Sequence, residues 1–378
     1  MKKVVILKIE DYDRGIIKEK IKQALEKHFD IFKLFDATDK IVLKPNLLME
    51  ATPEEAITTH PFFIEAVGQI FREKGNAVFV ADSPGGFVSN KDMDLIYEKT
   101  GIKEAAQNNG FDLLYPTQSF VVNDIPVCWW AAGCNKPQDG FKMINLAKLK
   151  THDVMVLTLA TKNLYGCISG LHKSHLHKMH PKTEDFTGVV LKLYEMVKPA
   201  LNIVDGILAL NGNGPAKRGK PKKLGLVIIG EDALYTDYAI SKTLGIKDKD
   251  NPLIKEAKIR GWLKEEELEL ISELKEETIK DFEFPDPFII NSIPSPLLNL
   301  LTPLIGFKPA IDLKKCRLCG KCIQVCPKKA ISLNKTLRID YKRCIMCMCC
   351  SEMCPHAAID ISTNPLIKVV KKIYKCFQ

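Results

Sequence analysis

Two runs of cysteine near the carboxyl end of the chain constrain its fold more than any other feature. The first run comprises Cys316, Cys319, Cys322 and Cys326 before Pro327, and the same spacing recurs 28 residues later in Cys344, Cys347, Cys350 and Cys354 before Pro355. A tight loop with thiolates at i, i+3 and i+6 can hold three corners of a cubic iron–sulfur cluster. Zinc prefers one closed set of four ligands, commonly two Cys-x2-Cys pairs. Eight thiols in two such runs therefore predict two [4Fe–4S] clusters.

The segment from about Ile311 to Thr363 resembles the bacterial-type dicluster ferredoxin domain. The stretches "KKAISL" and "HAAIDI" follow the two prolines, where that family forms its two small hairpins. In such ferredoxins the fourth cysteine of each run binds the other cluster. The resemblance implies Cys316, Cys319, Cys322 and Cys354 as ligands of the first cluster, and Cys344, Cys347, Cys350 and Cys326 as ligands of the second. Cys349 departs from the pattern, and we interpret it as a bystander, with an exchange ligand or a redox-active thiol as the alternative.

The rest of the 378-residue chain predicts one large domain ahead of the cysteine block. The apolar run at the start is interrupted by Lys8 and Glu10, which favours a first strand over a secretion signal and so a reducing, cytoplasmic location. The predicted domain boundaries are an α/β domain at 1–285, a proline-rich linker at 286–311, the two-cluster domain at 312–363 and a basic tail at 364–378. No transmembrane segment is expected, because the longest uncharged run, Pro287–Phe307, contains four prolines.

Short apolar runs alternate with helical patterns through the first half of the chain. Strands are predicted at "KVVILKI", "KIVLKPNLL", "NAVFVADSPGG", "FKMINL", "LNIVDGIL" and "LGLVIIG", and helices at Gly15–Phe29, Phe62–Lys74, Thr183–Val197 and Asp232–Leu244. Residues Asp250–Glu277 are charged and read as helical. This alternation predicts an α/β fold with a large, mostly parallel sheet covered on both faces, followed by a small α+β ferredoxin-like domain.

Polar side chains recur where the predicted strands end. Ligands of open parallel sheets bind beyond the carboxyl ends of the strands, and lysines there would suit a phosphate or carboxylate group. Ordinary loop residues and helix caps are the alternative for each residue taken alone. The expected substrate-binding residues are Lys44, Asn46, Asp82, Lys150, His152, Lys162 and Asn163. Neither G-x-G-x-x-G nor a Walker-type loop is present, so a standard dinucleotide or ATP site is not expected.

The motifs "VLKPNLL", "TTHP", "VADSPGG", "NLAKLKTHD" and "ATKNLYGCISGLHKSHLH" resemble those of the domain of unknown function 362 family. The resemblance covers roughly Val4 to Glu231, and several members of that family carry a carboxyl-terminal ferredoxin module. It implies an architecture and a site at the seven residues named above, without a settled reaction.

Four histidines, His172, His175, His177 and His180, lie within nine residues and form a candidate site for a further metal ion. The neighbouring Lys173 and Lys178 disfavour a cation, so a solvated or anion-binding loop is the stronger interpretation. Cys167 reads as a packing residue, with a nucleophile as the alternative, and Cys128, Cys134 and Cys376 read as structural.

The sequence therefore predicts an iron–sulfur electron-transfer protein, either an oxidoreductase or an electron-delivery subunit. Its partner would be a redox protein or a small anionic substrate, and nucleic acid is not expected because no reading motif accompanies the net charge of +9. The alternative is an iron–sulfur redox sensor or a metal or cofactor maturation protein. Whether the α/β domain is catalytic is left open.

Overall fold

The fold is taken from a computed structural model of the 378-residue chain, which describes residues 1–86, 89–134, 141–276, 278–286, 288, 308–334 and 336–361. The expected linker falls mostly outside these residues, and the basic tail with Cys376 falls outside them completely. Among the described residues, no helix is long and apolar enough to cross a membrane.

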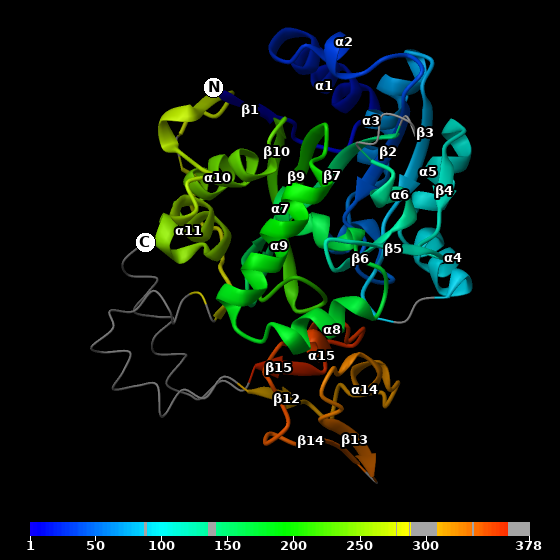
Figure 1. The fold of residues 1–378 in the computed structure, drawn as a ribbon, viewed down its shortest axis with the longest axis vertical. Helices are drawn as coiled ribbons and strands as arrows, with labels where there is room; N and C mark the ends of the chain where they lie inside the picture. Colours follow the sequence, from blue (N-terminus) through cyan, green and yellow to red (C-terminus); the bar gives the residue numbers. More distant parts are fainter. Residues whose placement is uncertain are drawn as a thin grey trace.

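A nine-stranded sheet forms the centre of the large domain (Figure 1). The strands lie in the order β11 (Leu268–Ser272), β1 (Lys2–Lys8), β10 (Gly219–Gly230), β9 (Leu201–Gly212), β7 (Phe141–His152), β2 (Lys40–Pro45), β3 (Ala77–Ala81) and β4 (Asp112–Leu114), with β8 (Val156–Thr158) paired to β7. Strand β10 is antiparallel to both its neighbours and β8 to β7, while the other pairs are parallel. The predicted mostly parallel sheet is confirmed.

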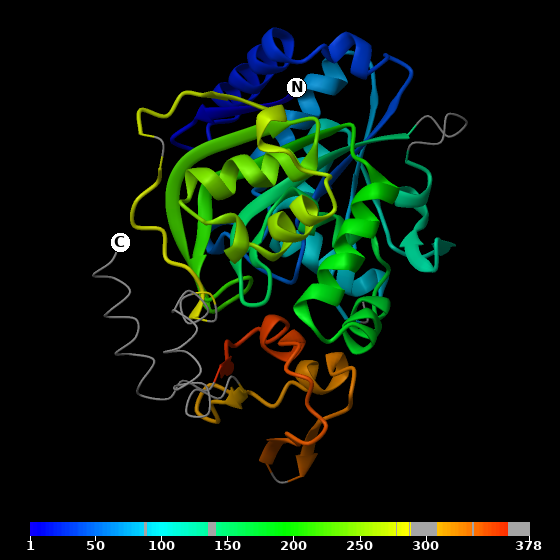
Figure 2. The ribbon, with the colours of Figure 1, turned by 60° about the vertical axis from the view of Figure 1, so that its left-hand side comes forward.

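Helices cover both faces of this sheet (Figures 1 and 2). The α-helices are α1 (Arg14–His28), α2 (Ile31–Leu34), α3 (Pro61–Glu73), α4 (Asn90–Lys99), α5 (Ile102–Asn109), α6 (Trp129–Ala132), α7 (Ala160–Asn163), α8 (His172–Met179), α9 (Thr183–Val197), α10 (Ala233–Thr243) and α11 (Pro252–Ile259). The 3₁₀ helices are η1 (Pro53–Glu55), η2 (Leu164–Cys167), η3 (Asp248–Asp250) and η4 (Glu265–Glu267), and β5 (Ser119–Val122) pairs with β6 (Ile125–Cys128) as a separate hairpin.

Successive side chains of a strand point to opposite faces of the sheet, so the core forms two layers, one on each face. In β1, Val4 and Ile6 pack with helices α9, α10 and α11, while Val5 and Leu7 pack with α1, α3 and α5. Local signals set where the helices begin: Pro61 occupies the first turn of α3, and the Asp232 side chain caps α10. The predicted helices at Phe62–Lys74, Thr183–Val197 and Asp232–Leu244 therefore match the structure within a residue at each end.

The charged segment Asp250–Glu277 is not helical throughout, which corrects the sequence-based prediction. Helix α11 ends at Ile259, because Gly261 adopts a left-handed conformation (φ +71°). Residues Leu268–Ser272 instead form β11, which pairs in parallel with β1 at the edge of the sheet. Charged residues are common on edge strands. The high charge of this segment therefore did not indicate a strand in the sequence.

The carboxyl-terminal module is a small α+β unit at one end of the molecule (Figures 1 and 2). It contains β12 (Pro309–Ile311), α14 (Lys321–Val325), β13 (Ile331–Asn334), β14 (Thr336–Ile339), α15 (Cys349–Glu352) and β15 (Ile359–Ile361). Strand β12 pairs with β15 and β13 with β14, both antiparallel. Residues 309–311, assigned to the linker from the sequence, thus contribute a strand to this module.

Candidate functional site

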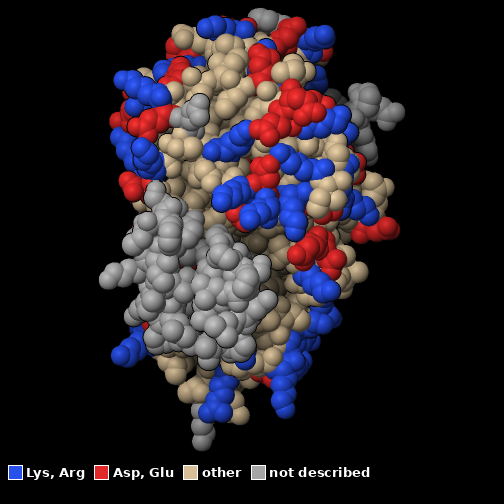
Figure 3. Space-filling view, turned by 90° about the vertical axis from the view of Figure 1, so that its left-hand side faces the viewer, with Lys and Arg blue, Asp and Glu red and all other residues tan. Residues whose placement is uncertain are grey.

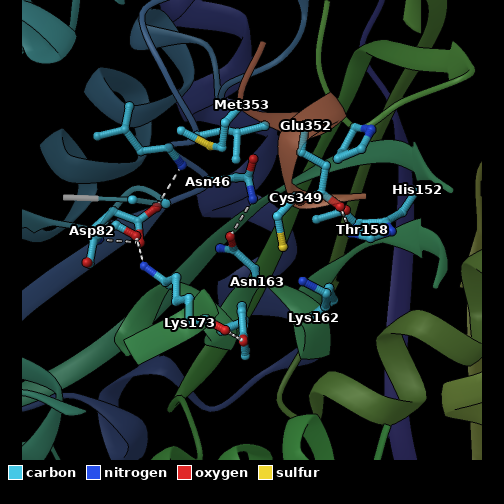
Figure 4. A pocket seen from close by; sticks show the side chains of 18 of the residues that line it. Asn46, Asp82, His152, Thr158, Lys162, Asn163, Lys173, Cys349, Glu352 and Met353 are labelled. Atoms are coloured by element: carbon cyan, nitrogen blue, oxygen red, sulfur yellow. Dashed lines mark hydrogen bonds and ion pairs between the residues drawn. The ribbon is translucent and has the colours of Figure 1, made fainter. Parts of the chain in front are cut away.

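A pocket lies between the large domain and the carboxyl-terminal module, beyond the carboxyl ends of β2, β3 and β7. Its cavity volume is about 90 Å³, which has room for several water molecules or a small ligand. Six of the seven expected site residues line it: Asn46, Asp82, Lys150, His152, Lys162 and Asn163. Four lining residues come from the module: Val325, Cys349, Glu352 and Met353. In Figure 4 the Cys349 sulfur points into the pocket near Lys162.

Lys44, the seventh expected residue, lies beneath the pocket in a buried ion pair. Its Nζ is 2.8 Å from Asp82 Oδ1, and Asp82 Oδ2 accepts a 2.6 Å hydrogen bond from the Leu47 amide. A Cβ on Gly166 would lie 2.1 Å from Asp82 Oδ1 and 2.5 Å from Lys44 Nζ. Glycine is therefore required at this point in the "NLYG" motif, since a side chain would displace the pair.

Four asparagine side chains form a directed chain that ends in the pocket. Asn202 donates to the Gly230 carbonyl, and Asn145 donates to Asn202 Oδ1 at 2.9 Å. Asn163 donates to Asn145 Oδ1, and Asn46 donates to Asn163 Oδ1, both at 2.8 Å. Each amide is thereby oriented by the one before it. Asn46 Oδ1 is left buried without a hydrogen-bond partner among the described residues.

Lys150, Lys162 and Lys173 are the lysines that line the pocket. Lys150 is 1% exposed, and its Nζ donates to the Ile57 carbonyl at 2.8 Å; burial lowers its pKa to about 7. Lys162 Nζ lies 4.5 Å from the centre of the Tyr165 ring, and burial lowers its pKa as well. Burying an ammonium group without an opposite charge costs free energy. An anionic ligand would offset that cost, because it supplies the opposite charge.

His152 is held in one tautomer at the wall of the pocket. Its Nδ1 accepts hydrogen bonds from the amides of Val154 and Met155 at 3.1 and 3.2 Å, so the neutral ring carries its proton on Nε2. That Nε2 lies 3.3 Å from Glu352 Oε1 of the module. Burial lowers the pKa of His152 well below its usual value and raises the pKa of Glu352.

The glycines of "DSPGG" bring the module close to the large domain. A Cβ on Gly85 would lie 3.0 Å from Met353 Sδ, and one on Gly86 would lie 3.3 Å from Val325 Cγ1. The close neighbours of both glycines are therefore side chains of the module. Lys173 fastens the same loop by donating to the carbonyl groups of Ser83 and Pro84, and burial lowers its pKa to about 8.

Other ion pairs also join the two parts. Arg218, in the basic loop Ala216–Lys223, contacts Asp153 of the large domain and, at 2.5 Å, Asp360 of the module. Lys321 of the module lies 3.2 Å from Glu50. Arg218 thus takes part in the contact between the domains.

Cys349 was interpreted from the sequence as a bystander, yet it lines the pocket and is buried. Its thiol donates to Cys347, and this hydrogen bond raises the pKa of Cys349 and lowers that of Cys347. Sequence reasoning also missed Glu352 and Met353 as pocket residues. In the sequence, the extra cysteine in "CMCC" was the only local sign of these pocket residues. Which module residues reach the pocket depends on how the module packs against the large domain.

The module brings the eight motif cysteines into two groups. Cys326, Cys344, Cys347 and Cys350 line one small cavity, although Cys326 belongs to the first run. Burial raises the pKa of the Cys322 thiol to about 11, with a further contribution from the nearby thiols of Cys319, Cys354 and Cys316. Among the described residues, no three of His, Cys, Asp or Glu converge on one metal ion. Four thiols spread around a cavity fit the corners of a cubane, so the donor set suits two clusters, and the crossed ligand assignment remains our prediction.

The four histidines do not assemble into a site. His177 lines the pocket and stacks on Phe186 at 4.2 Å, and burial lowers its pKa to about 3. His172, His175 and His180 line a different cavity, at the far side of helix α8. The further metal considered from the sequence therefore has no support among the described residues.

Several other expected residues serve the fold. Cys128, Cys134 and Cys167 are buried, and burial raises the pKa of each thiol. Thr59 Oγ1 donates to the Leu146 carbonyl, and His60 stacks on Tyr12 with ring centroids 3.7 Å apart. These contacts support the strand ends around the pocket.

The fold and its cysteine groups define an iron–sulfur protein in which a dicluster module is joined to a mostly parallel α/β domain. Two family models match the chain: domain of unknown function (DUF362) at residues 41–242, and the 4Fe-4S dicluster domain at residues 308–355. The chain belongs to the DUF362 family and carries a 4Fe-4S dicluster domain, as the sequence motifs predicted.

The chain is similar to a curated protein of Synechocystis sp., "thylakoid-associated protein sll1697". The two are 29% identical over 259 residues, which cover 65% of this chain and 75% of that protein. Among solved structures, "Loganic acid methyltransferase with SAH" aligns over 96% of this chain and 88% of its own, with 12% identity and a TM-score of 0.26. So low a score does not indicate a shared fold.

Proposed function

We propose that this chain passes single electrons between its dicluster module and a small anionic ligand in the pocket between the domains, as an oxidoreductase or an electron-delivery subunit. The supporting observation is that one pocket has lysines of the large domain on one wall and Cys349 of the module on the other. A ligand there would lie beside the segment that holds Cys347 and Cys350. Bound [4Fe–4S] clusters would supply the one-electron chemistry.

The chain's own residues would then perform three tasks. Lys150, which is buried, and Lys162, which is partly buried, bind the anionic group, since neither makes an ion pair with a carboxylate among the described residues. The closely packed "DSPGG" loop and Met353 exclude water from the pocket. Glu352 would carry the proton for a reduced ligand, and the N–H on Nε2 of the neutral His152, 3.3 Å from Glu352 Oε1, would position that carboxyl group.

The alternative proposal is an iron–sulfur sensor or a metal or cofactor maturation protein. The four histidines favour it slightly in the sequence, but His177 lines the pocket whereas His172, His175 and His180 line a different cavity. Electron transfer to a bound anion is therefore the better-supported function.

The proposal is tested by reducing the clusters anaerobically and following their reoxidation with a panel of carboxylate- and phosphate-bearing acceptors. We expect at least one acceptor to accelerate reoxidation, and Lys162→Gln to weaken the effect about tenfold or more, because a charge-assisted hydrogen bond is lost. Lys255→Gln, at an exposed lysine of α11, is the matched control and should behave like the unaltered protein. Equal rates for Lys162→Gln and the control would reject the pocket as the site.

Anion affinity should fall as pH rises above about 7. Burial lowers the pKa of Lys150 to about 7 from its ordinary 10.5, so Lys150 must take up a proton to bind an anion at higher pH. Affinity should then decrease about tenfold per pH unit. The unfolded chain keeps this proton up to about 10.5, so without ligand this group makes the folded state more stable as pH rises from 7. Calorimetric titration over this range checks the sign for binding, and urea unfolding without ligand checks the sign for stability. Lys150→Met should remove the part of the pH dependence that begins near 7.

A further inference from the structure

Positive charge is concentrated in the dicluster module. Residues 308–361 contain eleven Lys and Arg and four Asp and Glu, a net charge of +7, whereas the whole chain has +9. The remainder of the chain, although six times longer, is therefore almost neutral. Bound clusters and their thiolates would offset part of this charge, and the excess of basic side chains at this end would still attract anionic surfaces.

The charge is densest around one groove next to the second group of cysteines. Five basic residues line it: Lys178, Lys328, Lys329, Lys342 and Arg343. The other lining residues are Pro327, Cys344 and Ile345, so the described groove has no acidic residue. None of the five basic side chains makes an ion pair within the described part of the chain. In Figure 3, blue side chains likewise mark the lower end of the molecule.

The groove has the composition of a protein-binding surface. Ile345 gives it an apolar centre, and the next residue, Met346, is 49% exposed. Protein interfaces commonly combine an apolar, Met-containing centre with a charged rim. Helix α8 contributes Lys178, so both domains form the rim.

The groove and the pocket lie on two sides of the same group of cysteines. Cys344, which lines the groove, belongs with Cys347 and Cys350 to one cavity. Cys347 in turn accepts the hydrogen bond of Cys349, which lines the pocket. A centre held by these cysteines would connect the molecule's basic exterior with the pocket.

We propose that this groove is the docking site of an acidic one-electron carrier protein, which exchanges electrons with the cluster held by Cys326, Cys344, Cys347 and Cys350. In the forward direction the carrier loses one electron and the cluster gains it, with no bond formed and no proton moved; the reverse holds for electron export. The inference rests on one part of the proposed function, namely that the module carries electrons. A negatively charged partner is favoured because opposite charges raise the rate of encounter and fix the docked orientation.

The test uses the holoprotein and a reduced, acidic flavodoxin as the probe. Lys342→Glu/Arg343→Glu reverses charge in the groove, and Lys249→Glu/Lys255→Glu makes the same net change at exposed lysines of the large domain. We expect the groove variant to weaken flavodoxin binding, measured by fluorescence anisotropy, and to slow cluster reduction at low salt, each by at least about tenfold. The control should change either quantity by less than about twofold. Raising the salt concentration should reduce the difference.

Lys178→Glu provides a second variant outside the module, which leaves the cluster loops untouched and should also weaken binding. Equal losses in the groove and control variants would mean that only net charge matters, and would overturn the docking site. Binding to anionic phospholipid vesicles, without binding to flavodoxin, would assign the groove to a membrane surface and also overturn it. Reduction by flavodoxin is measured with the pocket empty, so it does not depend on ligand binding in the pocket and the two proposals can fail separately.

Discussion

Replacing Cys326 by serine is expected to remove one complete cluster. Cys326 shares a cavity with Cys344, Cys347 and Cys350, although it lies in the other run of the sequence. Anaerobically purified protein should contain about eight iron and eight sulfide ions per chain, and the variant about four of each. Cys349→Ser is the matched control: its thiol is not assigned to either cluster, so iron and sulfide should stay near eight.

Double variants test whether the two runs exchange their last ligands. If Cys326 and Cys344 serve the same cluster, Cys326→Ser/Cys344→Ser should lose no more iron than Cys326→Ser alone. Cys326→Ser/Cys316→Ser should lose nearly all iron, because it damages both clusters. The opposite result, with iron retained in the second pair and lost in the first, would show that each run binds its own cluster.

Replacing Asp205 by asparagine is expected to destabilise the large domain by about 3–5 kcal/mol. Lys148 Nζ lies 2.7 Å from Asp205 Oδ2, and both side chains are 0% exposed. The same carboxylate accepts hydrogen bonds from the Tyr12 hydroxyl at 2.7 Å and the His60 amide at 3.0 Å. Asparagine keeps the shape but leaves the Lys148 ammonium buried without a counter-charge. Urea unfolding followed by circular dichroism measures the loss.

Asp11→Asn is the control for this prediction, because Asp11 pairs with Lys223 at the surface and is 76% exposed. Its loss should cost about 1 kcal/mol or less. Removing both charges, as in Lys148→Met/Asp205→Asn, should recover a large part of the stability lost in the single variant. A single-variant loss below about 1 kcal/mol would mean that Lys148 is neutral in the folded protein.

The pocket residues of the large domain were predictable because they follow strands. Asn46 follows β2, Asp82 follows β3, and His152 ends β7, and these three strands are parallel neighbours. Parallel neighbours end at the same edge of a sheet, so their flanking side chains must meet. Cysteine spacing was equally informative, because it reflects local loop geometry.

Long-range contacts explain what the sequence did not reveal. Lys148 and Lys150 have the same position in the strand alternation, yet the register of β7 against β9 shifts between them, and only Lys150 reaches the pocket. Whether Lys148 pairs with Asp205 depends on tertiary packing. The placement of Cys349 and Met353 in the pocket wall depends on domain docking, for which a single sequence carries no periodic signal.

The asparagine chain has a consequence for what the pocket accepts. Since its polarity runs from the Gly230 carbonyl outwards, the acceptor left without a partner among the described residues is Asn46 Oδ1, and a 180° flip of that one amide would set two C=O groups against each other. We therefore expect bare anions to be discriminated against. Molecules that place a hydroxyl or amino hydrogen beside the charged group, such as hydroxy acids, would be selected.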